Sequence, residues 1–159
     1  MDRIETIRKA VDEILLGRSE ADHRRHGYVH LYGVSLIAGL LAKKRHLDVE
    51  LAVISGMLHD ISTYRDGTHE GHHAKSALLA SEILLKTGLF APHEMESVAN
   101  AIGKHGRKGL TDGALDELLK DADVMHHYFY NPFWSPIGKE IPRIKKLGDE
   151  LGFGMDASP

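Results

Sequence analysis

Apolar residues recur at helical spacing along almost the whole chain, and this periodicity restricts the fold to a helical one. Val34, Ile37 and Leu41 show the pattern, and no alternating strand pattern exceeds four residues. The predicted helices are a first one ending near Gly17, then segments at about 28–44, 49–60, 72–86, 92–105, 112–125 and 143–151. We therefore predict an all-α bundle of about six or seven helices around one core.

The length of 159 residues suits one domain with one core, so we expect a single domain over residues 1–159. The helix at 49–60 contains LAVISGML, is apolar on nearly all sides and should be the most buried. A polar loop is expected at 62–71, and a non-helical connection with three prolines at 130–142. The tail at 152–159 is expected to be loose.

The composition excludes several classes of protein. Hydrophobic residues make up 42% and charged residues 27%, and the net charge of −3 gives no reason to expect general nucleic-acid binding. The longest apolar stretch, at 51–58, is too short to span a bilayer, and the N-terminal segment lacks the apolar centre of a signal peptide. We expect a cytoplasmic protein without membrane contact, and a homodimer as the default assembly.

Histidine is unusually frequent, with twelve residues, whereas cysteine is absent. The absence of cysteine excludes disulfides, a thiol nucleophile and any cysteine-ligated zinc site. The histidines are dispersed along the chain and never exceed two in a row. This combination directs attention to metal sites made of imidazole nitrogen and carboxylate oxygen.

Several of these side chains fall on core-facing positions. His30 precedes Val34 at helical spacing, and His105 continues an apolar stripe in the same way. His59 and Asp60 end the most apolar helix, and Asp123 follows Ala122 in another apolar helix. Burial of ionisable groups is costly unless something compensates their charge, and one divalent cation would compensate all of them together. The alternative, a set of individually satisfied histidines and capping aspartates, requires several independent coincidences.

These residues resemble a known family signature. His30 in YVHLYGV, His59 and Asp60 in GMLHDIS, and Asp123 in KDADVMHH look like the H…HD…D pattern of the HD-domain superfamily of metal-dependent phosphohydrolases. The resemblance covers residues 20–130. It implies an HD-type bundle in which these four residues hold a divalent metal ion (Mn, Co, Ni, Fe, Zn or Mg). It also implies hydrolysis of a phosphomonoester or phosphodiester in a phosphorylated small molecule, a nucleotide above all.

Two questions about the ligands stay open. Asp121 competes with Asp123, because periodicity does not choose between them, although the resemblance favours the position after the alanine. One or two ions fit the sequence. His73 and His105 would hold a second ion, with Asp60 bridging both, and His72 competes closely with His73. His105 also fits a helix C-terminal position favoured by the helix dipole.

The resemblance also implies roles for residues near the ligands. Asp60 would hold or deprotonate the attacking water as well as bind metal. Substrate phosphates need cationic contacts, for which Arg65, Lys104 and Arg107 are candidates, although each also fits an ordinary loop charge. His126 and His127 lie one turn after Asp123 and are candidates for groups that orient the ligands, with ordinary packing as the alternative.

Two other functions use the same residues. Some members of the superfamily are mixed-valence di-iron oxygenases with four histidines and two aspartates, and bound iron with a coupled-pair EPR signal would indicate that chemistry. A non-enzymatic module that binds a nucleotide is the second alternative. The sequence contains no P-loop, Rossmann glycine fingerprint, GxSxG elbow or HExxH motif, so other catalytic classes lack support.

Overall fold

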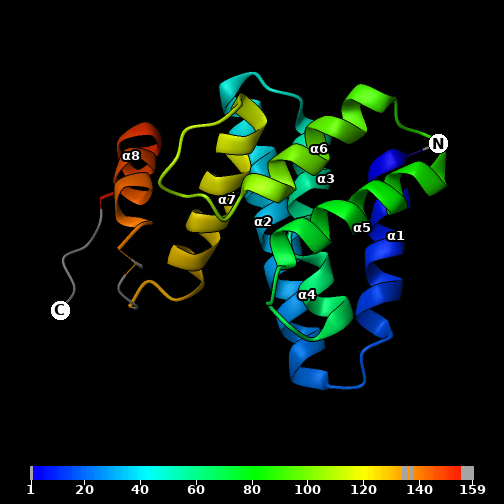
Figure 1. Cartoon of the computed structure of the whole chain (residues 1–159). Helices are drawn as coiled ribbons and strands as arrows, with labels where there is room; N and C mark the ends of the chain where they lie inside the picture. Colours follow the sequence, from blue (N-terminus) through cyan, green and yellow to red (C-terminus); the bar gives the residue numbers. More distant parts are fainter. Residues whose placement is uncertain (1, 134–135, 137, 155–159) are drawn as a thin grey trace.

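The computed structural model describes residues 2–133, 136 and 138–154, and this part of the chain contains eight helices and no strand (Figure 1). The helices are α1 (Arg3–Leu16), α2 (Ala21–Arg45), α3 (Val49–Leu58), α4 (Ile61–Asp66), α5 (His72–Thr87), α6 (Pro92–Lys104), α7 (Ala114–Tyr130) and α8 (Ile141–Leu151). The prediction of an all-α fold is confirmed. Most of the expected loose tail, at 155–159, and residues 134, 135 and 137 of the proline-rich connection lie outside the described residues.

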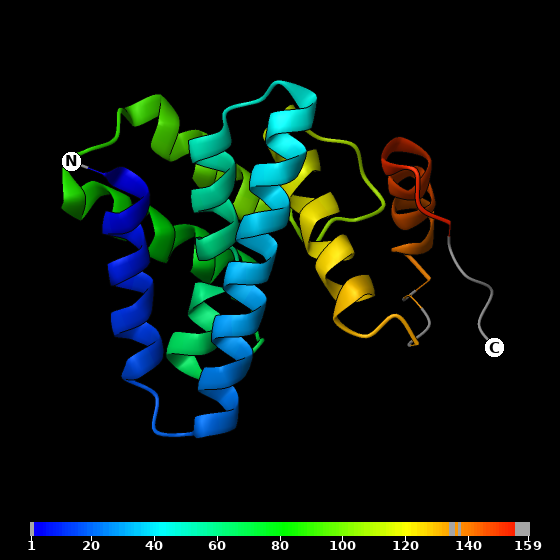
Figure 2. The same ribbon diagram turned by 180° about the vertical axis from the view of Figure 1, so that it is seen from behind.

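The helices α2 and α3 form the centre of the bundle. The pair α5 and α6 packs on one side of them and α7 on the other, while α1 and α8 lie at opposite ends (Figures 1 and 2). Seven of the ten residues of α3 are buried, as its apolar sequence predicts. Gly56 lets α2 approach closely, because a Cβ atom there would lie 2.5 Å from the Cα atom of Ser35. This contact sets the spacing between the two helices that carry His30 and His59.

The main departure from the sequence-based prediction is α4, which occupies part of the expected polar loop. Its residues read as polar, yet Ser62 and Thr63 are buried and Tyr64 is 7% exposed. The Ser62 backbone N–H donates to the Ser76 hydroxyl at 3.1 Å, and this bond joins α4 to α5. The polar residues of this segment therefore face a neighbouring helix rather than solvent. The helix α2 also begins earlier than predicted, at Ala21.

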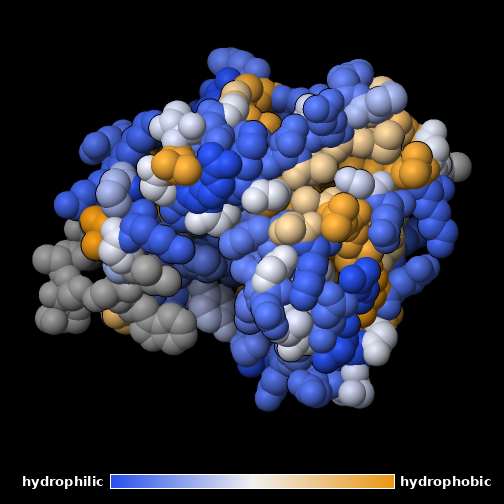
Figure 3. Space-filling view, in the orientation of Figure 1, coloured by the Kyte–Doolittle hydropathy of each residue, from blue (hydrophilic) through white to orange (hydrophobic). Residues whose placement is uncertain are grey.

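The surface includes one apolar strip, which Figure 3 shows crossing the region of α5 and α6. Leu78 and Leu85 on α5 are 67% and 69% exposed. Among the described residues, no helix combines the length and the hydropathy that a membrane span requires.

Candidate metal centre

The junction between α3 and α4 carries the adjacent His59 and Asp60. Successive side chains on a continuous helix diverge by about 100°. His59 keeps helical backbone angles, whereas Asp60 leaves the helix with φ −116° and ψ 17°. The break brings the Asp60 Oδ2 atom to 3.7 Å from the His59 Nε2 atom. Two neighbours in sequence can therefore face the same point.

Four side chains from three parts of the chain converge around that point. The Nε2 atoms of His30 and His59 lie 2.9 Å apart. The His30 Nε2 atom is 3.5 Å from Asp60 Oδ2 and 3.6 Å from Asp123 Oδ1. The His59 Nε2 atom is 3.7 Å from the same Asp123 oxygen. The structure thus brings together the four residues that the resemblance singles out.

Backbone carbonyls orient three histidines around this cluster. The Nδ1 atoms of His59, His72 and His105 lie 2.8, 2.7 and 2.7 Å from the carbonyl oxygen three residues earlier. A carbonyl oxygen only accepts, so each Nδ1 carries the proton and donates. In the neutral ring, each Nε2 atom then keeps its lone pair. This nitrogen is the atom that can bind a metal ion.

His30 is oriented by a histidine instead of a carbonyl. Its Nδ1 atom lies 3.1 Å from the Nδ1 atom of His126, whose Nε2 atom is 3.2 Å from the Val29 carbonyl oxygen. Because that carbonyl accepts from His126 Nε2–H, the His126 Nδ1 atom accepts from His30 Nδ1–H. Gly33 makes room for this arrangement, since a Cβ atom there would lie 2.3 Å from the His126 ring. Burial above all lowers the pKa of His126 to about 4, which keeps the ring neutral.

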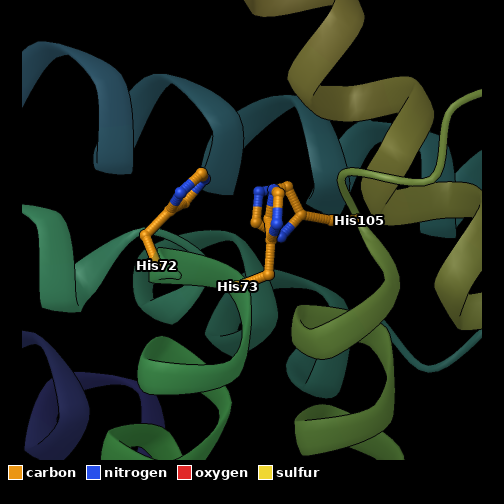
Figure 4. Close-up of side chains that lie close together, drawn as sticks. All are labelled: His72, His73 and His105. Atoms are coloured by element: carbon orange, nitrogen blue, oxygen red, sulfur yellow. The ribbon is translucent and has the colours of Figure 1, made fainter. Parts of the chain in front are cut away.

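A second group of histidines lies on the other side of Asp60. The Asp60 Oδ1 atom is 3.2 Å from His105 Nε2 and 3.4 Å from His72 Nε2. Figure 4 shows His72 and His73 at the start of α5, with the ring of His73 close to that of His105. The ring centroids of His73 and His105 are 4.6 Å apart, and the ligand atoms of all three histidines lie within 4.8 Å of one another. Asp60 therefore has one oxygen toward each group, and both His72 and His73 remain candidates.

Each carboxylate of this cluster has one oxygen without a hydrogen-bond donor among the described residues. Asp60 Oδ1 and Asp123 Oδ1 are buried without a hydrogen-bond partner among the described residues. Burial by itself raises the pKa of both carboxyls. Contacts with the surrounding histidines outweigh burial at Asp60, as do the Lys108 charge and the histidine contacts at Asp123, and they hold both pKa values well below the usual range. Buried anionic oxygens without donors require a compensating cation. Together with imidazole nitrogens they form a donor set that fits a divalent first-row metal ion.

Asp121 faces different partners from those of Asp123. Its two carboxylate oxygens lie 2.9 Å from an Arg45 nitrogen and 2.9 Å from an Arg143 nitrogen. The structure therefore places Asp123, and not Asp121, beside His30 and His59.

The structure does not bring the three predicted phosphate-binding cations to the cluster. Arg65 pairs with Asp66 at 2.7 Å, Lys104 with Asp116 at 2.8 Å and Arg107 with Asp112 at 3.1 Å. Arg65 and Arg107 pair with carboxylates close to them in the sequence, and Lys104 at the end of α6 pairs with Asp116 in α7. The loop after α6 instead turns Lys108 inward, where its buried ammonium group donates to Asp123 Oδ2.

His127 connects the cluster to a carboxylate that sequence reasoning missed. Its Nε2 atom is 3.3 Å from Asp123 Oδ1, and its Nδ1 atom is 3.1 Å from Glu140 Oε1. Burial lowers the pKa of His127, but the Glu140 hydrogen bond and the Asp123 charge outweigh burial and raise it. Neither Lys108 nor Glu140 belongs to an apolar helical stripe, so the sequence contains no signal that either side chain turns inward.

An all-α bundle with a buried cluster of histidines and aspartates defines a class, the helical proteins built around a divalent-metal centre. The chain belongs to the HD-domain family, because the family model described as HD domain matches residues 27–128. The match contains His30, His59, Asp60 and Asp123. The predicted resemblance is confirmed, and with it the prediction of a hydrolase of this family.

Curated relatives of the chain include ribonuclease Y from several bacteria. The protein from Clostridium perfringens (strain SM101) is 38% identical over 93 residues, which cover 57% of this chain and 17% of the relative. The protein from Chlorobium luteolum is 34% identical over 96 residues, covering 60% and 17%. The protein from Oceanobacillus iheyensis is 28% identical over 144 residues, covering 89% and 26%. The chain thus spans only 17% to 26% of the length of these relatives.

A solved structure has a similar fold. It is the crystal structure of a predicted HD superfamily hydrolase from an uncultured Thermotogales bacterium, with a TM-score of 0.61 and 20% sequence identity. The similarity covers 93% of this chain and 88% of the other. At this level of identity the comparison supports the fold of the bundle alone.

Proposed function

We propose that this chain is a metal-dependent phosphohydrolase that cleaves a nucleotide phosphodiester. The observation that carries the proposal is the convergence of imidazole lone pairs and unpartnered carboxylate oxygens. His30, His59, Asp60 and Asp123 would hold one ion, with Nε2 and carboxylate atoms 2.9–3.7 Å apart. Asp60, His105 and either His72 or His73 would hold a second.

The residues around the cluster suit attack on phosphorus. A bound divalent cation supplies Lewis acidity and activates water for that attack. Asp60 is positioned to accept a proton, since one of its oxygens faces each group of candidate ligands. The Lys108 ammonium group carries three N–H donors, of which one is directed at Asp123. The others would contact a phosphoryl oxygen of the substrate, a role predicted from the sequence for Arg65, Lys104 and Arg107.

The comparisons favour a ribonucleotide as the substrate. The relatives are named ribonuclease Y, and this chain carries the HD domain at residues 27–128. The net charge of −3 supports a short oligonucleotide or dinucleotide over a long nucleic acid held mainly by its phosphates. The names of the relatives and the net charge therefore both support hydrolysis of a phosphodiester bond in a short ribonucleotide.

The test compares the wild type with Asp60→Asn and with the surface control Asp22→Asn, whose side chain is 91% exposed. We expect the Mn²⁺-loaded wild type to hydrolyse bis(p-nitrophenyl) phosphate and short ribonucleotides. Asp60→Asn should lose at least about 100-fold in activity and in Mn²⁺ affinity by titration calorimetry, since even partners that only orient ligands contribute about 10–100-fold.

Three outcomes contradict the proposal. The first is Mn²⁺-loaded protein that hydrolyses none of these substrates. The second is bound iron with a coupled-pair EPR signal and oxygen consumption, which would indicate an oxygenase. The third is a nucleotide-binding protein in which Asp60→Asn leaves every measured property unchanged, as expected of a non-enzymatic module.

A further inference from the structure

A cavity of about 610 Å³ lies beside the metal centre, and the proposed chemistry at the ions does not account for it. Residues of α2, α4, α7 and α8 line it, including His30 and His127 on the side of the cluster. Its volume falls within the range of about 300–1,000 Å³ that is typical of small-molecule sites. A substrate whose phosphate reaches the cluster can therefore extend a second group into this cavity.

The walls of the cavity suit a flat aromatic group. Val29, Val124 and Ile144 supply apolar surface, while Tyr64 and Tyr128 supply aromatic rings. Aromatic and aliphatic walls favour a planar ligand that can stack and exclude water. Among the parts of a nucleotide, only the base has this shape and low polarity.

One ionic acceptor lies in this apolar cavity. Glu140 is 4% exposed and lines the cavity, and its Oε1 atom accepts a hydrogen bond from His127 Nδ1. The second oxygen, Oε2, has no hydrogen-bond partner in the part of the chain that the structure describes. A buried carboxylate only accepts, so the best ligand offers donors to it. His127 also contacts Asp123, so that a single side chain separates this acceptor from the metal centre.

We propose that the cavity binds the guanine base of the substrate, with Glu140 accepting hydrogen bonds from the guanine N1–H and 2-amino groups. The proposal rests on the proposed phosphohydrolase function and assigns its substrate class. Guanine has two adjacent donors on its pairing edge, which match the two oxygens of one carboxylate. Adenine and cytosine present a single amino group next to a ring acceptor, and uracil presents one N–H between two carbonyl oxygens. Those acceptors would be repelled by the carboxylate.

The test measures equilibrium binding of nucleosides to the Mn²⁺-loaded protein by titration calorimetry. Nucleosides contain no phosphate, so turnover cannot affect the measurement. Inosine lacks the 2-amino group and 1-methylguanosine lacks the N1 donor. We expect guanosine to bind about tenfold more tightly than either, as for a good bidentate contact to a base. This comparison needs no variant and remains decisive even if a substitution prevents folding.

The matching variant is Glu140→Gln, which keeps the shape of the side chain but replaces one acceptor with a donor. It should remove the preference for guanosine over inosine, whereas the control Glu96→Gln on the exposed side of α6 should keep it. Equal affinities for guanosine and inosine in the wild type would overturn the proposal, as would a preference that survives Glu140→Gln or no nucleoside binding at all. Failure of phosphodiester hydrolysis alone would contradict the proposed phosphohydrolase function, but guanosine binding could still be measured. A failure of the proposed function and a failure of the guanine-binding proposal are therefore distinguishable.

Discussion

Two faces of α7 carry similar charged residues, but the partners of these residues differ between the faces. Asp121 and Asp123 are two residues apart, so they point to nearly opposite sides of the helix. On one face, Arg45 and Arg143 neutralise both oxygens of Asp121. On the other face, Asp123 Oδ1 lies among histidines and has no hydrogen-bond donor among the described residues.

The lysines of this region show the same contrast. Lys120 is fully buried and donates to the Leu110 carbonyl oxygen, Asp112 and Glu117. All three of its donors are therefore used within the protein. Lys108 donates one hydrogen bond, to Asp123, in the part of the chain that the structure describes. A face whose charges are all paired stabilises the fold, whereas a face with unpaired buried oxygens and spare donors is suited to a ligand.

The largest expected effect comes from removing the charge of Asp121 on the paired face, which is the face of α7 where Arg45 and Arg143 pair with Asp121. Asp121→Asn leaves Arg45 and Arg143 with less compensation between α2, α7 and α8. Removing one partner of a buried ion pair costs about 3–5 kcal/mol, and we expect the lower end because both arginines keep a glutamate partner. Urea unfolding measures this change, with the exposed Asp149→Asn as the control. Unchanged stability together with loss of Mn²⁺ affinity would reverse the roles assigned to the two faces.

Asp123→Asn changes the opposite face, where Asp123 Oδ1 has no hydrogen-bond donor among the described residues. We expect it to lower the affinity for Mn²⁺ more than the free energy of unfolding. An amide is a weaker metal ligand than a carboxylate, so Mn²⁺ affinity should fall by at least about 100-fold, or about 2.7 kcal/mol. The free energy of unfolding measured with a chelator present should fall less than in Asp121→Asn, because Asp123 pairs with one cation, Lys108, whereas Asp121 pairs with two arginines. Calorimetric titration and chelator-treated unfolding measure the two quantities. Equal losses of stability in both variants would remove the distinction between the faces.

The smallest effect concerns the response of the paired face to acid. The hydrogen bond from Arg45 lowers the pKa of Glu150 below its usual 4.5. In Glu117, burial raises the pKa, but the hydrogen bond from Lys120 and other contacts outweigh burial and lower it. A carboxyl with a lowered folded pKa stabilises the protein above its unfolded pKa, and the stabilisation is lost as pH falls through the folded value.

The expected result is a free energy of unfolding that decreases as the pH drops below about 4.5, with a shallower decrease in Arg45→Met. Urea unfolding at several pH values with a chelator present measures both slopes, and the chelator removes any contribution of bound metal. Identical slopes for the wild type and Arg45→Met would show that this pair does not contribute to acid sensitivity.

The sequence predicted the helices well where burial follows periodicity, and less well where polar residues are buried. The stripe through Val34 and Leu41 identified α2, and the apolar run of α3 identified its burial. The helix α4 was missed because Ser62 and Thr63 read as loop residues, and their burial depends on Ser76 in α5. Such a contact between separate helices leaves no local pattern.

The site shows the same limit. Core-facing periodicity and the family resemblance selected His30, His59, Asp60 and Asp123, which lie together in the structure. Periodicity could not separate Asp121 from Asp123, because the difference lies in the partners supplied by other helices. It also could not find Lys108, since the direction in which a loop lysine points is decided by tertiary packing.

His127 touches both the metal centre and the cavity, through Asp123 on one nitrogen and Glu140 on the other. Thermodynamic linkage makes such a connection reciprocal. A ligand in the cavity that changes the position or protonation of the His127 ring would change the affinity for the ion. The ion would then change the affinity for that ligand by the same factor. If both proposed sites are occupied, a single imidazole would couple them over the length of one side chain.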